Sequence, residues 1–193
     1  MGIVQLRMGH AGRVTRRLCM QSYTRTAVWM HWSMAVLVLA LMVVGFSLPE
    51  EEGAARSLGI QLHKSFGLVA WALLMFRVAW RFTHRPPAPP AGLSPLQHRV
   101  AEWVHGLLYL LLFVQPLLGY LSASFAGYPM LWFGLELPQW GWKDPEINHF
   151  FTECHEISAF VLIALVVVHA AAALHHAFVR RNGMLRRMGI PLG

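Results

Sequence analysis

Four long apolar segments dominate the chain, at about residues 27–48, 58–80, 100–124 and 150–179. Each reaches or exceeds the roughly 20 residues that a helix needs to cross about 30 Å of hydrocarbon. Inside a membrane every backbone polar group must be paired within the segment, so such runs form helices. A soluble four-helix bundle would show a polar face along each segment, and none is visible. The pattern therefore predicts an all-α integral membrane protein, a bundle of four transmembrane helices.

The overall composition agrees with this prediction. Hydrophobic residues make up 56% of the 193 residues and charged residues only 13%. A soluble domain typically carries about 25% charged residues. The four apolar segments account for this bias.

The basic residues are distributed unevenly between the two sides of the four-span arrangement. Thirteen of the 16 Lys and Arg residues fall on the side of the two termini and the second connection, and only Arg56, Lys64 and Lys143 fall on the other. Because cytoplasmic connections carry the excess of Lys and Arg, both termini are predicted to be cytoplasmic. The net charge of +7 then reflects topology and contact with membrane lipid, and it indicates no nucleic-acid binding.

Two parts of the chain are distinguished. Residues 1–22 form a basic cytoplasmic tail without a long apolar run or a cleavage-site pattern, so they are not a signal peptide, and Met20 is a second candidate start. Residues 23–188 form the four-span domain.

Cys19 and Cys154 fall on opposite sides of the membrane in this arrangement and are expected not to pair. The chain has no Cys-x-x-Cys-His motif for covalent attachment of haem.

The connection between the third and fourth segments is long and aromatic. It contains Trp132, Phe133, Trp140 and Trp142, and rings of this kind settle at a membrane interface. The connection is predicted to be either an interfacial cap or a lid over a cofactor.

Four histidines lie inside the apolar segments or at their ends, where an ionisable side chain is costly and indicates a functional site. His155 and His169 are 14 residues apart, which is about 21 Å along a helix, and they lie nearly on one face. One metal ion cannot bind two groups so far apart. His63 is expected at the outer depth of His155, and His31 at the inner depth of His169. The pattern predicts two His–His pairs at two depths, each bridging two helices.

Haem suits such pairs better than zinc does. Zinc requires four ligands, usually with Cys or carboxylate among them, and only Glu153 and Glu156 lie near the outer pair. Haem iron needs only axial ligands, and its flat apolar ring fits between the helices of a bundle. Arg77 lies 14 residues after His63 and Arg81 one turn further on, so both cations are expected at the inner depth, where they would pair with haem propionates.

Several stretches resemble the bacterial cytochrome b561 family over residues 23 to about 188. They read WMHWSMAVLVLALM, LHKSFGLVAWALLMFRVAWRF, WFGLELP, CHEISAF and VHAAAALHHAFVRRNGMLRRM. The resemblance implies a four-span cytochrome of the bacterial inner (plasma) membrane with two haem b groups, the inner held by His31 and His169 and the outer by His63 and His155. The family includes a superoxide:ubiquinone oxidoreductase, so the resemblance also implies ubiquinone as a substrate or bound ligand.

A quinone exchanges protons when it changes redox state, so its site needs titratable groups beside the inner haem. His176 lies seven residues after His169 and nearly in register on its face. His105 lies near the same end of the third segment, and Ser33 is a third candidate. We expect these residues to neighbour the quinone.

The outer side carries eight acidic residues against three basic ones. The average electrostatic field of this side therefore repels an anion such as superoxide. Lys64, beside His63, would nevertheless provide a local positive charge at which an anion could approach. An acidic surface would equally suit docking of a basic periplasmic redox protein.

Three functions remain open from the sequence. The first is an oxidoreductase that links a periplasmic one-electron donor, superoxide among the candidates, to membrane ubiquinone. The second is a haem-bearing membrane anchor or electron-relay subunit for a partner dehydrogenase or a soluble redox protein. The third is a non-redox, histidine-lined metal transporter.

Overall fold

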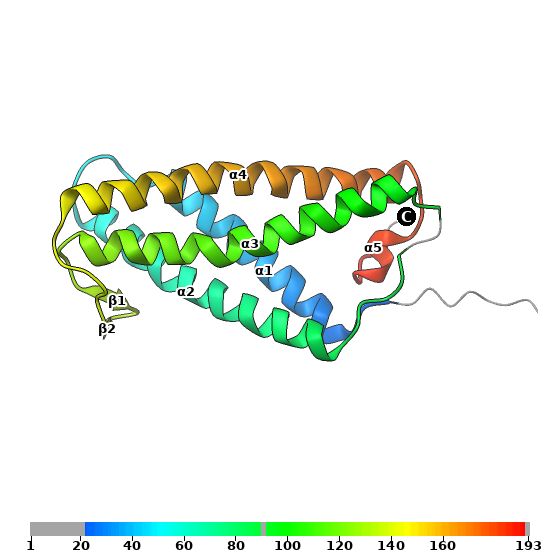
Figure 1. The fold of residues 1–193 in the computed structure, drawn as a ribbon, viewed down its shortest axis with the longest axis horizontal. Helices are drawn as coiled ribbons and strands as arrows, with labels where there is room; N and C mark the ends of the chain where they lie inside the picture. Colours follow the sequence, from blue (N-terminus) through cyan, green and yellow to red (C-terminus); the bar gives the residue numbers. More distant parts are fainter. Residues whose placement is uncertain (1–21, 90–91, 192–193) are drawn as a thin grey trace, which may run out of the picture.

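The computed structural model describes residues 22–89 and 92–191. Four long helices run alternately up and down as a bundle: α1 (Arg25–Phe46), α2 (Ala54–Thr83), α3 (Pro95–Phe125) and α4 (Pro145–Phe178) (Figure 1). All four are long and apolar enough to cross a membrane. The prediction of a four-helix transmembrane bundle is confirmed. Most of the predicted basic tail, with Cys19, lies outside the described residues.

Three of these helices begin at side chains that cap their free N–H groups. The hydroxyl of Thr24 accepts a hydrogen bond from the Ala27 N–H at the start of α1. Ser94 and Gln97 form a reciprocal capping box at the start of α3. Asp144 caps α4, and a proline follows it at the first helical position. These polar residues set the helix starts at the ends of the apolar runs.

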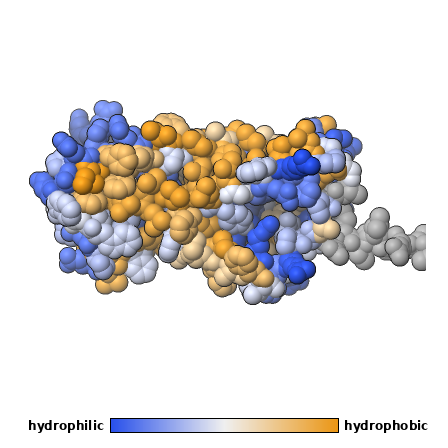
Figure 2. All heavy atoms as spheres, in the orientation of Figure 1, coloured by the Kyte–Doolittle hydropathy of each residue, from blue (hydrophilic) through white to orange (hydrophobic). Residues whose placement is uncertain are grey.

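The two ends of the bundle carry different connections. Residues 22 and 191 lie at the same end as the α2–α3 connection, which we call the tail end (Figure 1). The α1–α2 and α3–α4 connections lie at the opposite end, the hairpin end. On the face shown in Figure 2 an apolar belt crosses the middle of the bundle, and hydrophilic residues gather toward both ends. This distribution is the one expected of helices that span a bilayer.

A two-stranded antiparallel hairpin closes the hairpin end, with β1 at Met130–Trp132 and β2 at Leu135–Leu137. Phe133 and Gly134 form its turn with φ of 47° and 88°. The Phe133 N–H donates to the buried Ser65 hydroxyl at 2.9 Å, which fixes the hairpin against α2. These strands of three residues each were not predicted from the sequence. The interfacial cap and the lid over a cofactor both stay predictions.

The chain returns to the bundle after α4 through the short helix α5 (Met184–Arg187). The Trp32 indole N–H donates to the Met188 carbonyl at 2.9 Å, and the Tyr23 N–H to the Arg187 carbonyl at 3.3 Å. The Arg187 guanidinium, which is buried, donates to the Ala88 carbonyl at 2.6 Å. This C-terminal segment therefore holds together the start of α1 and the α2–α3 connection.

Candidate cofactor sites between paired histidines

The structure brings the four predicted histidines together in two pairs. The rings of His31 on α1 and His169 on α4 have centroids 6.1 Å apart. The rings of His63 on α2 and His155 on α4 are separated by the same 6.1 Å. Helix α4 thus contributes one histidine to each pair, and the 14 residues between them place the pairs about 21 Å apart in depth.

The outer pair is oriented by the backbone of α3. His155 Nδ1 lies 3.0 Å from the Gln115 carbonyl oxygen. Because a carbonyl can only accept, Nδ1 carries the proton and the Nε2 lone pair is free to bind a metal. The Gln115 side chain donates in turn to the His155 carbonyl at 2.9 Å and accepts from Ser158. Gln115 and Ser158 were not predicted from the sequence.

Two glycines lie against the outer pair and were also missed. A Cβ on Gly45 of α1 would lie 3.1 Å from the His63 ring, and a Cβ on Gly119 of α3 would lie 3.2 Å from the His155 ring. Each glycine therefore leaves room for an imidazole at a helix surface where any side chain would crowd it.

A repeated spacing in the sequence could have revealed these glycines. Each of the four helices carries a pair of residues 14 apart, one at each depth, which places both residues nearly on one face. The pairs, given with the inner residue first, are His31 and Gly45, Arg77 and His63, His105 and Gly119, and His169 and His155. The inner level thus gathers three histidines and an arginine, and the outer level two histidines and two glycines.

The inner pair has two polar neighbours. The His105 ring lies 5.1 Å from that of His169. Arg77 interacts electrostatically with His31, His105 and His169, which places its charge at the inner level. Its Nε donates to the Tyr109 hydroxyl at 3.0 Å and its Nη1 to the Ala27 carbonyl at 3.3 Å. A cation held by two hydrogen bonds beside the histidines is suited to pair with a propionate.

Both histidine pairs fit a haem with two axial imidazoles. Two imidazole nitrogens on opposite sides of one metal, each about 2 Å from it, hold their ring centroids about 6 Å apart. In the described part of the chain, no three His, Cys, Asp or Glu side chains are placed to hold a metal ion. A zinc site needs more ligands than either pair supplies, whereas haem iron needs only these two.

The remaining predicted residues lie at various distances from the pairs. Arg81 is exposed on α2, one turn beyond Arg77, and Lys64 is half-buried next to His63. Ser33 is exposed on α1, two residues from His31 and so on another side of the helix. His176 lies at the end of α4, where Nδ1 is 3.0 Å from the Asn182 amide nitrogen. Their functional roles stay predictions.

We expect Gly119→Val to displace His155, because the new side chain would overlap its ring. The haem content of the purified variant should fall well below that of the unmodified protein. Gly106→Val is the matched control on the same helix, since a Cβ there meets no atom within 4 Å. Equal haem content in the two variants would show that the glycine is not needed at this position.

Trp32→Phe should loosen the C-terminal segment, because it removes the hydrogen bond to the Met188 carbonyl. One such bond contributes about 1 kcal/mol, so the thermal midpoint should fall by about 2–4 °C. The control is Trp29→Phe, at a side chain on the same helix that is 74% exposed. An unchanged midpoint for Trp32→Phe would mean that this bond does not hold the segment.

Comparison with known proteins agrees with this geometry. A family model described as prokaryotic cytochrome b561 matches residues 22–189. "Cytochrome b561 homolog 2" of Escherichia coli is 32% identical over 82% of this chain and 86% of its own length. "Cytochrome b562" of Cereibacter sphaeroides is 29% identical over 88% and 96%. "Probable superoxide oxidase CybB" of Yersinia pestis is 27% identical over 87% and 96%.

The four membrane helices and the two histidine pairs are typical of a membrane-embedded b-type cytochrome. The chain belongs to the prokaryotic cytochrome b561 family. It is therefore a multi-pass bacterial membrane protein that binds haem b and takes part in electron transfer. This conclusion replaces the alternative of a non-redox metal transporter.

Proposed function

We propose that the chain carries electrons from a one-electron donor at the hairpin end to ubiquinone at the tail end. The hairpin end faces the periplasm and both termini face the cytoplasm of the bacterial inner membrane. The proposal rests on one observation. The bundle holds two histidine pairs at two depths, and the ring centroids are equally far apart in both pairs. Two haem b groups, bound between these pairs, supply a one-electron carrier at each depth.

The chain's own residues hold and orient these groups. His31 and His169 hold the inner haem, and His63 and His155 the outer haem. The Gln115 carbonyl fixes the tautomer of His155. Arg77 and Arg81 neutralise the propionates of the inner haem at the tail end of α2.

Ubiquinone binds beside the inner haem, where two histidines can handle its protons. His105 Nδ1 lies 2.6 Å from the Ala101 carbonyl, so its Nε2 is free to accept a proton. His176 Nδ1 accepts from the Asn182 amide, so its Nε2 carries a proton that can be donated. Ser33 contributes a further hydroxyl on α1. Arg77 and Arg81 favour the negative charge that reduction places on the quinone oxygens.

Superoxide is the donor that we propose for the hairpin end. One relative is itself named a probable superoxide oxidase, which supports this choice. The acidic residues at this end repel an anion on average, whereas Lys64 lies directly beside His63. Lys64 would thus guide superoxide to the outer haem.

Lys64→Glu should slow haem reduction by pulsed superoxide roughly tenfold, because it reverses the charge of the lysine next to His63. Stopped-flow absorbance of the haem measures this rate, which should also depend on ionic strength in the unmodified protein. Lys143→Glu, the same charge reversal at an exposed lysine of the hairpin end, is the control and should have a smaller effect.

The acidic hairpin end supports a second candidate, a relay for a basic soluble redox protein or a partner dehydrogenase. The same stopped-flow experiment separates the two. Rapid reduction by superoxide with ubiquinone as final acceptor supports the oxidase. No reduction by superoxide, together with fast reduction by a small basic redox protein, would replace it with the relay.

A further inference from the structure

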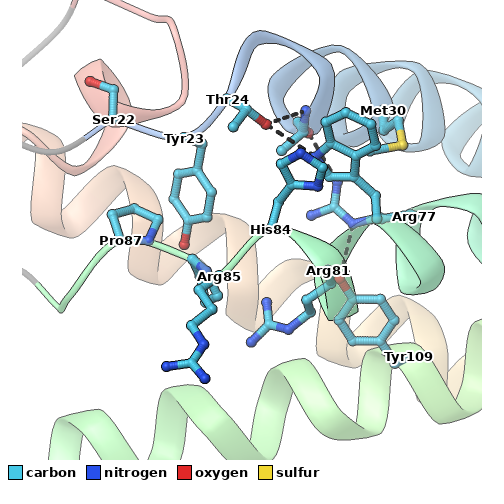
Figure 3. Close-up of a pocket in the computed structure, with 13 residues that line it drawn as sticks. Ser22, Tyr23, Thr24, Met30, Arg77, Arg81, His84, Arg85, Pro87 and Tyr109 are labelled. Carbon is cyan, nitrogen blue, oxygen red and sulfur yellow. Dashed lines mark hydrogen bonds between the residues drawn. The ribbon is translucent and has the colours of Figure 1, made fainter.

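A cavity of about 450 Å³ opens at the tail end between the start of α1, the end of α2 and α3. Three arginines line it, Arg77, Arg81 and Arg85, and the lining residues include no Asp or Glu. In Figure 3 the side chains of Arg81 and Arg85 project beside each other below Tyr23. The concentration of positive charge without a counter-charge indicates a site for an anion.

The three arginines are not equivalent. Arg77 is engaged by Tyr109 and Ala27 and lies at the level of the inner histidines. The side chains of Arg81 and Arg85 make no hydrogen bond or ion pair with any residue in the described ranges 22–89 and 92–191, and both are exposed. Arg85 is the farther from the histidines along the chain, and nothing in the haem assignment uses it.

The cavity wall around Arg85 is rigid and amphipathic. The His84 ring stacks on the Trp80 ring with centroids 3.8 Å apart, and the Trp80 indole N–H donates to Thr24 at 3.2 Å. Pro86 and Pro87 follow Arg85 and restrict its backbone to extended conformations. Met30 and these rings provide the apolar part of the wall, and the Tyr23 and Tyr109 side chains bring further hydroxyls.

The surroundings also lack competing carboxylates. Nine acidic residues occur in the chain, and eight of them lie in the hairpin-end connections or in the adjoining first part of α4. The exception is Glu102 on α3, which pairs with His98 at 3.6 Å and is not among the residues that line the cavity. Among the protein side chains that line the cavity, an anion therefore meets arginines and no opposing carboxylate.

We propose that this cavity binds the phosphate group of an anionic phospholipid, with Arg85 as the cationic partner and with Arg77 and Arg81 left to the propionates of the inner haem. The cavity is lined by residues at the start of α1 and the end of α2, at the tail end of the bundle, where lipid headgroups are expected. Guanidinium groups bind phosphate oxygens in a bidentate manner, and basic pockets between membrane helices take acidic headgroups. The apolar wall faces the glycerol and upper acyl chain.

Native mass spectrometry of the haem-loaded, delipidated protein tests this proposal by titration with phosphatidylglycerol and, separately, phosphatidylcholine. The unmodified protein should retain phosphatidylglycerol in preference, because the choline cation is repelled by the arginines. Arg85→Gln should weaken phosphatidylglycerol binding about fivefold, whereas Arg99→Gln, at an exposed arginine of the same end outside the cavity, should not. Arg85→Lys should bind with intermediate affinity.

The haem content of each variant reports its folding, so a loss of lipid with full haem content is specific to the cavity. Competition with millimolar inorganic phosphate separates the two sources of a phosphate group. Failure of inorganic phosphate to displace the lipid shows that the acyl chains are needed and supports the lipid. Arg85-dependent binding of inorganic phosphate without binding of phosphatidylglycerol would overturn the lipid as the source. Equal binding of both lipids, or equal effects of Arg85→Gln and Arg99→Gln, would overturn the site.

Discussion

His155→Ala should remove the outer haem and leave the inner one, so that the haem-to-protein ratio falls from two to one. His169→Ala should give the same ratio by removing the inner haem instead. The reason is that each variant leaves one histidine pair intact, with its rings 6.1 Å apart. Pyridine haemochrome analysis measures the ratio, and the reduced-minus-oxidised spectrum and the midpoint potential of the remaining haem identify it.

His149→Ala is the matched control on the same helix, because His149 is exposed and pairs with the exposed Glu153 at 3.3 Å. It should retain both haems. The pairing is refuted by loss of the same haem in His155→Ala and His169→Ala. A combination of His63→Ala with His155→Ala should lose no more haem than either change alone, since both residues hold one group.

His176→Ala should slow ubiquinone reduction about a hundredfold, the lower end of what a positioned acid–base group contributes. The His176 Nε2–H is the proton donor that the Asn182 amide holds in place. His105→Ala should slow the same step, because it removes the acceptor nearest to His169. In both variants the two haems should stay bound and be reduced by dithionite at normal extent, so that only the oxidation of reduced haem by ubiquinone becomes slow.

His98→Ala is the control for these variants, since His98 is an exposed histidine at the same end of the bundle. In this variant ubiquinone should oxidise the reduced haem at the same rate as in the unmodified protein. Unchanged rates in both His176→Ala and His105→Ala would place the quinone elsewhere. A loss of haem in His105→Ala alone would instead give that residue a role in holding the inner haem.

The sequence was sufficient to predict the four helices and which histidines lie next to each other. Apolar runs of this length can only be helices in a membrane, and the spacing of His155 and His169 sets two depths without any knowledge of the other helices. Each of these two histidines then pairs with the one that lies at its own depth. His31 is near the tail end of its span and His63 is nearer the hairpin end of its span, so His31 lies at the level of His169 and His63 at the level of His155. The structure pairs these residues as the sequence predicts.

Other features depend on how neighbouring helices are rotated, which no single helix reveals. Gly45 and Gly119 matter only because they face imidazoles on α2 and α4. The Gln115 carbonyl orients His155 from another helix, 40 residues away along the chain. The hairpin has strands of three residues, too short for an alternating pattern to stand out. The bond from Trp32 to Met188 spans 156 residues, and a local pattern carries no signal for it.

The haem-to-protein ratio of the fully loaded, unmodified protein tests whether one chain holds two haems at two depths. The measurement combines pyridine haemochrome absorbance with quantitative amino-acid analysis of the same sample. The two histidine pairs predict a ratio of two, with both haems reducible and of b type. A ratio of one in fully loaded protein would contradict the presence of two haems per chain. One histidine pair would then have no cofactor, and electrons could not cross the bundle between the two depths.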